Sequence, residues 1–257
     1  MQLPREVNRR VGRALHDYAM LADGDRVLVA VSGGVDSLVL LWLLSHWRRK
    51  APIDYQLLPV HVDMAAGPDG QPGEAARRVA ALVASLGHRL EILPALWRPE
   101  PPEPQVADSH PAGRDLCFRC SRSRRTQLFA HAHTRACTTI AFGHHRDDII
   151  ETFLLNLTCA GNISTMVPRQ TLFGGNLHLI RPLAYLDKTE VEAIGRELAL
   201  EPVRSACPLA ENTRRRDMHD LAVEIERRVP GARARIFAAL GNVRGDYLLR
   251  QSGGRRP

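Results

Sequence analysis

The sequence predicts an α/β fold in which a doubly wound, mainly parallel sheet is followed by a basic helical extension. Short apolar runs alternate with helical segments along the first 200 residues, as they do in doubly wound sheets. A glycine-rich turn joins the first apolar run to a helix, and after Pro202 the pattern becomes helical and rich in arginine. We therefore expect two parts, a sheet domain over residues 1–200 and a mainly helical C-terminal extension over residues 201–257.

The predicted strands are short apolar runs bounded by turn residues, at residues 26–31, 56–62, 89–93, 138–142 and 177–180. The predicted helices show apolar residues at helical spacing, at residues 38–48, 74–86, 121–133, 147–157, 189–199, 214–228 and 232–240. Pro59 lies within the second strand, although proline cannot donate to a strand ladder. The proline-rich stretch between Pro94 and Pro111 is too long for an ordinary connection, and it predicts an active-site lid or a mobile insert.

The turn after the first strand is the most informative segment of the chain. It consists of Ser32, Gly33, Gly34, Val35, Asp36 and Ser37. The N–H groups at a helix N-terminus lack partners within the helix and attract anions, and two glycines let an oxygen atom approach the main chain. This SGGVDS turn therefore predicts a phosphate site. The alternative is an ordinary strand-to-helix turn capped by Ser32 or Asp36.

The composition favours a cytoplasmic enzyme with one α/β core. At 257 residues and 44% hydrophobic content, the chain is long enough to bury such a core. No apolar run reaches the ~18 residues of a membrane span, and the N-terminal segment lacks the apolar region of a secretory signal. The five cysteines are odd in number and unevenly spaced, which favours reduced thiols or metal ligands over a disulfide framework.

The formal net charge is +7, and most of the excess lies near the end of the chain. From Arg204 onward there are twelve arginines and six acidic residues, a surplus of six. A second basic cluster contains Arg114, Arg119, Arg122, Arg124 and Arg125. Two separate basic regions favour a nucleic-acid partner over the alternative, which is that both are solvated helix faces.

The residues after the second and fourth strands are further candidates, because doubly wound sheets bind ligands beyond the carboxyl ends of their strands. Asp63 ends the second strand and can accept a hydrogen bond from ribose or adenine. The fourth strand is followed by Gly143 and by a segment rich in histidine and acidic residues. In that segment Asp147, Asp148 and Glu151 can hold magnesium through oxygen ligands, whereas Asp147 can instead cap a helix.

Cys117 and Cys120 are spaced so that their sulfur atoms can turn toward one point. This spacing fits a redox disulfide, a zinc half-site or an iron–sulfur half-site equally, and a third cysteine must decide. Cys207 is the candidate, since its loop is expected at the carboxyl edge of the sheet. Cys137 precedes an apolar strand and Cys159 follows an apolar helix, so both are predicted to be small buried hydrophobic residues.

Several segments resemble known families. The SGGVDS turn resembles the pyrophosphate-binding loop of the PP-loop ATP pyrophosphatases, which have an adenine nucleotide alpha hydrolase-like fold and split ATP between its α and β phosphates to adenylate a substrate oxygen. Four further segments resemble the tRNA 2-thiocytidine synthetase group of that superfamily. They are CFRCSRSRR at residues 117–125, GHHRDDIIETFLLNL at 143–157, LIRPLAY at 179–185 and ENTRRR after Cys207.

This resemblance implies an enzyme that uses ATP to replace the C2 oxygen of a cytidine in the tRNA anticodon loop with sulfur, forming AMP and pyrophosphate. It implies a [4Fe–4S] cluster held by Cys117, Cys120 and Cys207, with one iron left open to deliver sulfur. It also implies that residues 1–200 form the catalytic ATP-binding domain. The expected partners are ATP with Mg²⁺, tRNA, and a sulfur donor that is either a persulfide or sulfide, with a homodimer as a further option.

The resemblance also assigns roles within the site. The ATP phosphates would lie over the SGGVDS turn, and the adenosine would point toward Asp63 and Gly143. Arg124 and Asp148 would stabilise charge and orientation during adenylation. Val35 stands where the family usually carries a lysine, and Arg124 can supply the positive charge near the α-phosphate.

Three alternatives stay open from the sequence. The first is a 2-thiouridine-forming enzyme, whose core is flanked by zinc-finger cysteines that this chain lacks. The second is a lysidine-type ligase that uses an amine instead of sulfur, and the cysteine triad counts against it. The third is a non-catalytic zinc-binding RNA module, which Val35 favours.

Overall fold

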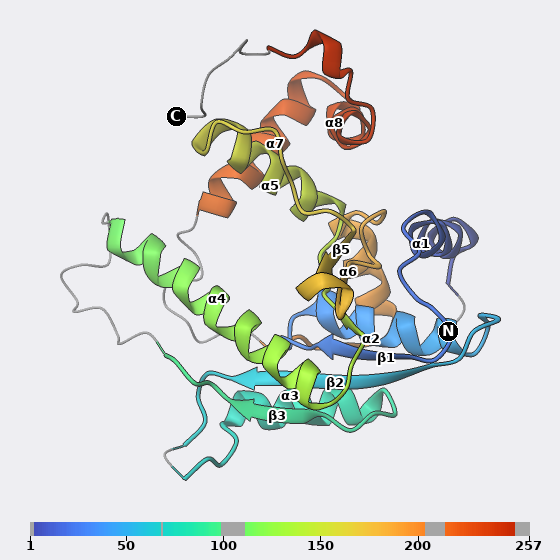
Figure 1. Ribbon diagram of the computed structural model, residues 1–257, viewed down its shortest axis with the longest axis vertical. Coiled ribbons are helices and arrows are strands. Elements are labelled where there is room, and N and C mark those ends of the chain that lie inside the picture. The colour runs from blue at the N-terminus through green and yellow to red at the C-terminus, as the bar shows by residue number, and fades with distance from the viewer. Residues whose placement is uncertain (1–2, 68, 99–110, 204–213, 250–257) are drawn as a thin grey trace.

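A computed structural model describes residues 3–67, 69–98, 111–203 and 214–249 (Figure 1). In this part of the chain six strands form one sheet in the order β3-β2-β1-β4-β6-β5. They are β1 (Asp25–Ala30), β2 (Tyr55–Asp63), β3 (Glu91–Pro94), β4 (Thr139–Ala141), β5 (Arg169–Leu172) and β6 (Leu177–Ile180). All neighbouring strands are parallel except β5, which runs antiparallel to β6 at the edge.

Strand order changes direction at β1, because β2 and β3 lie on one side of it and β4 and β6 on the other. Ligands of doubly wound sheets bind beyond the carboxyl ends of the strands at such a reversal. The segments that follow β1 and β4 therefore flank the expected crevice. These segments are the SGGVDS turn and the stretch that begins near Gly143.

Helices cover both faces of the sheet. One face shares a core with α1 (Arg5–Asp17), α2 (Val35–Arg48), α3 (Glu74–Ser85) and α6 (Lys188–Glu197). The other face packs against the C-terminal half of α4 (Pro111–Thr134), through Leu128 and Ala132. The strands alternate between the two cores, since Val27 and Val29 of β1 belong to the first and Leu28 to the second.

A separate helical unit lies at one end of the sheet. Helix α5 (Arg146–Cys159) packs against α7 (Arg214–Arg228) and α8 (Ala232–Leu240), and the three share a small apolar core around Ile150, Leu154 and Ala222. Figure 1 shows these helices grouped apart from the strands, while α4 extends beyond the sheet. Two short 3₁₀ helices, η1 (Phe173–Gly175) and η2 (Gly245–Tyr247), complete the described elements.

The predicted mainly parallel α/β sheet is confirmed, and β6, α7 and α8 have the predicted bounds. Pro59 is tolerated because β3 pairs with β2 only from Val60 onward, so its missing N–H has no partner in the ladder. Two elements were not predicted, α1 and β5. The division of the chain at residue 200 stays a prediction.

The predicted start of α4 at residue 121 is wrong, because the helix begins at Pro111 and contains both Cys117 and Cys120. Cys137 is buried as predicted, but Cys159 is exposed because the apolar contact of α5 with α7 ends before its last turn. Residues 99–110, which make up most of the predicted lid, lie outside the described residues. Among the described helices, none combines the length and apolar character needed to cross a bilayer.

Candidate functional site

The SGGVDS turn joins β1 to α2 through a tight arrangement of serine and glycine. The Ser32 N–H donates to Ser37 Oγ over 3.1 Å, and the Ser37 hydroxyl donates to the Gly34 carbonyl over 2.9 Å. No side chain caps α2 at Gly34, so the alternative in which Ser32 or Asp36 caps this helix is wrong. The Ser37 N–H donates to the Gly34 carbonyl over 3.2 Å, and the N–H groups of Val35 and Asp36 at the start of α2 are the ones that can meet an anion.

Gly33 has a positive φ of 91° and lies where a side chain would not fit. A Cβ atom there would lie 2.7 Å from Val79 Cγ2 of α3. The Gly33 carbonyl accepts a hydrogen bond of 3.0 Å from the N–H of Val203. The last described residue before the 204–213 gap is therefore bonded to the turn.

Gly143 brings the segment after β4 against the same turn. A Cβ atom at Gly143 would lie 2.9 Å from the carbonyl carbon and oxygen of Asp36 and 3.0 Å from the N atom of Ser37. These neighbours are backbone atoms at the start of α2, which cannot move aside as a side chain can. Gly143 therefore lies against the SGGVDS turn, where a larger residue would collide with its backbone, and the role of Gly143 toward adenosine stays a prediction.

Asp63 lies at the end of β2, as predicted, and its side chain is buried. Its two carboxylate oxygens accept hydrogen bonds from the N–H groups of Ala65, at 2.8 Å, and Gly73, at 2.7 Å. The carboxylate thus orders the β2–α3 connection, and its role toward ribose or adenine stays a prediction. Nearby, burial lowers the pKa of His61, and the Arg124 cation lowers it further, which places Arg124 within electrostatic reach of this strand end.

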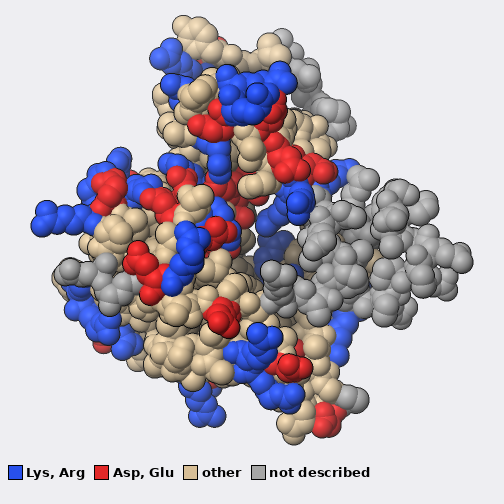
Figure 2. Space-filling model, turned by 180° about the vertical axis from the view of Figure 1, so that it is seen from behind, with Lys and Arg blue, Asp and Glu red and all other residues tan. Residues whose placement is uncertain are grey.

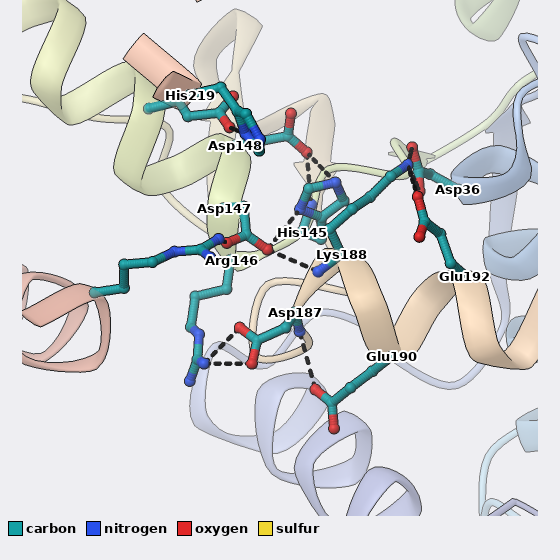
Figure 3. Close-up of polar contacts among 12 residues, drawn as sticks. Asp36, His145, Arg146, Asp147, Asp148, Asp187, Lys188, Glu190, Glu192 and His219 are labelled. Carbon is teal, nitrogen blue, oxygen red and sulfur yellow. Dashed lines mark hydrogen bonds and ion pairs between the residues drawn. The ribbon is translucent and has the colours of Figure 1, made fainter. Parts of the chain in front are cut away.

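Beside the turn lies an ion-pair network that sequence reasoning missed (Figure 3). Lys188 Nζ lies 2.7 and 2.9 Å from the two carboxylate oxygens of Asp36. The backbone N–H of Lys188 donates to Asp147 Oδ2 over 2.7 Å, and Asp147 is buried and also pairs with Arg233 of α8. The only local signal was a capping box at the start of α6, in which Asp187 and Glu190 exchange backbone hydrogen bonds.

The N-cap of α5 is not the residue expected from the sequence. His145, and not Asp147, is the N-cap residue, and Asp148 Oδ2 accepts a 2.9 Å hydrogen bond from the His145 N–H. Glu151 faces His219 of α7 at 2.8 Å, and burial raises the pKa of the Glu151 carboxyl. The His145 ring lies 3.5 Å from Asp147 and 3.3 Å from Asp148, while Glu151 turns to His219, and the role of these three acids toward magnesium stays a prediction. Within the described ranges, no three His, Cys, Asp or Glu side chains gather as metal ligands.

The charge of Asp148 acts on the pKa values of two further basic groups, the half-buried His144 and the buried Arg181. Burial lowers the pKa of His144 to about 4, so this histidine is neutral near pH 7. Burial also lowers the pKa of Arg181 to about 10, and the nearby cations Arg125 and Arg215 act in the same direction. Residues of α4 and α7 therefore approach the end of β6. Seen from the opposite side, the surface is hollowed near its middle, and Lys or Arg atoms lie within the hollow (Figure 2).

Cys117 and Cys120 lie one helical turn apart on α4, and both are partly buried. Residues at this spacing share one face of a helix, so the two sulfur atoms can serve one ligand. Arg119 lies between them, with its guanidinium carbon 5.2 Å from the centroid of the Trp97 ring. Cys207, the predicted third ligand, lies outside the described residues. The three-cysteine site stays a prediction.

Comparisons with known proteins agree with this geometry. Residues 3–203 match a family model described as a PP-loop domain. The chain is 36% identical over 250 residues to a tRNA-cytidine(32) 2-sulfurtransferase of Sorangium cellulosum, covering 97% of this chain and 85% of that protein. It is also 36% identical over 253 residues to a protein of the same name from Pelobacter propionicus, covering 98% of this chain and 90% of that protein.

A solved structure shares the fold. It is a U34-tRNA thiolase, NcsA from Methanococcus maripaludis, with its [4Fe–4S] cluster. The TM-score is 0.71 at 22% sequence identity, and the match covers 93% of this chain and 77% of that chain.

Gly143 offers a test of this site. We expect Gly143→Ala to lower the free energy of unfolding by about 1–3 kcal/mol, as overpacking against fixed neighbours does, and to weaken ATP binding because the start of α2 must shift. Gly241→Ala is the matched control, since a Cβ there meets only the Ala238 carbonyl oxygen at 3.8 Å. Urea denaturation and calorimetric ATP titration measure the two effects. If Gly143→Ala and Gly241→Ala had the same free energy of unfolding and the same affinity for ATP, the close contact of Gly143 with the start of α2 would be contradicted.

Proposed function

The chain belongs to the PP-loop family and is similar over most of its length to proteins named tRNA-cytidine(32) 2-sulfurtransferase, and we propose that it is an ATP-dependent tRNA thiolase. It replaces the C2 oxygen of a cytidine in the anticodon loop with sulfur. The observation that carries the proposal is the uncapped SGGVDS turn, at the strand-order reversal and against Gly143. That arrangement suits a polyphosphate at the helix N-terminus.

The first half of the proposed reaction is adenylation. ATP binds with its phosphates over the SGGVDS turn and its adenosine toward Asp63 and Gly143, and Mg²⁺ accompanies the phosphates. The C2 oxygen of the target base attacks the α-phosphorus, forming an O-adenylate as the bond to pyrophosphate breaks, and AMP is then the leaving group at C2. Asp148 and Arg124 orient the reactants and stabilise developing charge. A base must leave its stack to reach such a pocket, which favours a loop nucleotide.

The second half is sulfur transfer. We propose Cys117, Cys120 and Cys207 as the ligands of a [4Fe–4S] cluster, and the shared helix face of the first two supports this assignment. When bound, the cluster would supply an iron without a cysteine ligand that can take up sulfur at the oxidation level of sulfide. The chain's own residues bind the base so that sulfur reaches C2 as AMP departs.

The proposed partner surface is the basic helical unit. Helices α7 and α8 hold seven arginines against four acidic residues, and the first turn of α7 is exposed. Phosphates of tRNA bind such a surface without base recognition, while the pocket selects the nucleotide. A cytoplasmic location and a homodimeric assembly complete the proposal, with residues 1–200 as the catalytic domain and residues 201–257 as the extension that carries Cys207.

The proposed function is tested by the products. With tRNA, ATP and sulfide under anaerobic conditions, we expect 2-thiocytidine in the digested tRNA, detected by mass spectrometry, together with AMP and pyrophosphate. Asp148→Asn should slow turnover about 10²-fold or more, as loss of one charge-stabilising group does. Asp54→Asn removes the same charge at an exposed position before β2, away from the proposed tRNA surface, and should leave turnover unaltered. Formation of ADP and orthophosphate instead would exclude the proposed chemistry.

The cluster assignment has its own test, which does not depend on activity. Protein prepared without oxygen should be brown and contain about four irons and four sulfides per chain, and it should bleach in air. Replacing Cys117, Cys120 or Cys207 by serine should remove the iron and abolish thiolation. Cys159→Ser is the control, because that side chain is exposed at the end of α5. A colourless, air-stable protein that contains zinc would favour the non-catalytic RNA module.

The salt dependence of tRNA binding tests the basic surface. Each neutralised phosphate releases counterions, so affinity should fall steeply with salt. Replacing Arg214, Arg215 and Arg216 together by alanine should flatten the slope of log affinity against log salt by up to about 3. Arg9→Ala on α1 is the control, since Arg9 is exposed and paired with Glu6. An unchanged slope in the triple variant would mean that this face is merely solvated.

A further inference from the structure

Phe118 presents an exposed aromatic ring on the N-terminal half of α4, where its side chain is 56% exposed. It lies outside the three apolar cores that the described residues form. The other phenylalanines have apolar neighbours in those cores or, at Phe173, the ring of Phe129. A single exposed apolar residue is ordinary on a protein surface, so the surroundings of Phe118 decide whether its ring has a function.

The surroundings of this ring are basic. Helix α4 carries five arginines and one acidic residue in its sequence. Phe118, Arg122 and Arg125 follow one another at steps of four and three residues, so they share one stripe of the helix. All three side chains are exposed. The ring therefore lies on a positively charged surface, which suits a partner that carries phosphates.

The stripe leads away from the carboxyl ends of the strands. Near the other end of α4, Phe129 meets Phe173 edge to face, with the ring centroids 5.8 Å apart. Because η1 precedes β6, that contact lies at the amino ends of the parallel strands. The N-terminal half of α4 therefore projects past their carboxyl ends, as Figure 1 shows. Phe118 lies about 16 Å farther along the helix axis than Phe129.

The inner end of the stripe reaches the candidate site. Burial, followed by the charge of Arg125, lowers the pKa of Arg181, which comes directly after β6. The stripe on α4 thus runs from the strand ends, where the nucleotide turn lies, out to Phe118.

A second aromatic residue supports the same surface. The Gln127 side chain of α4 accepts a hydrogen bond of 3.3 Å from the Leu96 N–H and donates one of 2.7 Å to the Pro94 carbonyl. These bonds hold the chain after β3 against α4. One residue further on, the Trp97 ring faces the Arg119 guanidinium at 5.2 Å, and this cation–π contact keeps a positive charge beside Phe118.

We propose that Phe118 is the platform on which an unpaired base of the tRNA anticodon loop stacks, while Arg122 and Arg125 bind phosphates of that loop. This inference rests on the proposed function and adds the surface that receives the loop. An exposed ring among arginines is the combination by which proteins hold unpaired nucleotides, since every base has a face that can stack. Cys117 and Cys120 flank Phe118 along the helix, so the stacked base lies beside the residues proposed to hold the cluster.

The test is titration of the full-length protein, prepared without oxygen, with two RNAs: an unmodified tRNA and the same tRNA without its anticodon arm. We expect Phe118→Ala to weaken binding of the complete tRNA about 5- to 150-fold, the range for one stacked base, and to leave binding of the armless tRNA unchanged. Phe118→Tyr keeps a ring and should bind as the wild type does. Phe173→Ala is the matched control, because that ring is 62% exposed but lies at the opposite end of the sheet.

Iron content and thermal unfolding show whether each variant holds its cluster and is folded. Phe118→Leu keeps apolar volume without a ring, and it should also bind the complete tRNA weakly; it carries the comparison if Phe118→Ala loses iron. Wild-type affinity for tRNA in Phe118→Leu or Phe118→Ala would overturn the proposal, and so would an equal loss of affinity for both RNAs. Unchanged tRNA affinity with slower sulfur transfer from a persulfide-carrying protein would overturn it too, by assigning the surface to that protein.

The proposed function fails by a different result. If the wild type bound both RNAs with the same affinity, the chain would not recognise the anticodon arm at all, whatever the role of Phe118.

Discussion

The buried carboxylate of Asp147 is the constraint on which the arrangement of the site depends. A charge that is only 2% exposed must be paired and hydrogen-bonded, because its removal from water is costly. Arg233 of α8 and the N–H of Lys188 supply that compensation, and the His145 ring lies 3.5 Å away. One carboxylate therefore holds together the starts of α5, α6 and α8. Removing the Arg233 guanidinium would leave the buried carboxylate without its ion-pair partner in α8 and would release the start of that helix.

The order of the strands brings the segments after β1 and β4 together at the SGGVDS turn. Because β1 lies where the strand order reverses, the segments after β1 and β4 leave the sheet beside each other. Gly143 allows their backbones to touch, and Gly33 allows α3 and the chain at Val203 to approach from the other side. The absence of side chains at these two glycines is thus a packing requirement, and it leaves main-chain N–H groups as the principal lining of the anion site.

Local sequence patterns predicted the α/β fold and the strand-to-helix position of the SGGVDS turn, because both depend on residues that are neighbours in the chain. A phosphate turn and a helix are defined by neighbouring residues, so SGGVDS and the helical spacing of α7 could be read directly. The pairs Asp36–Lys188 and Asp147–Arg233 join residues far apart in the chain, and no periodicity reveals them. Helix α1 was missed although Val7, Val11 and Ala14 have helical spacing, because charged residues surround them. Cys159 was predicted buried from its apolar helix, but it is exposed, because the apolar residues that α5 shares with α7 and α8 end at Leu154.

The ion pairs and hydrogen bonds around Asp147 and Gly33 connect the SGGVDS turn to the basic helical unit and to the segment at Val203. The path from Arg233 through Asp147 and Lys188 to Asp36 runs from the basic helical unit to the turn. On the other side, the hydrogen bond between Val203 and Gly33 ties the turn to the chain four residues before Cys207. A displacement of either neighbouring segment therefore acts on groups that contact the phosphate site. The SGGVDS turn is built from β1 and α2, but its geometry also depends on the basic helical unit and on the segment at Val203. A change in the affinity for pyrophosphate would report that dependence.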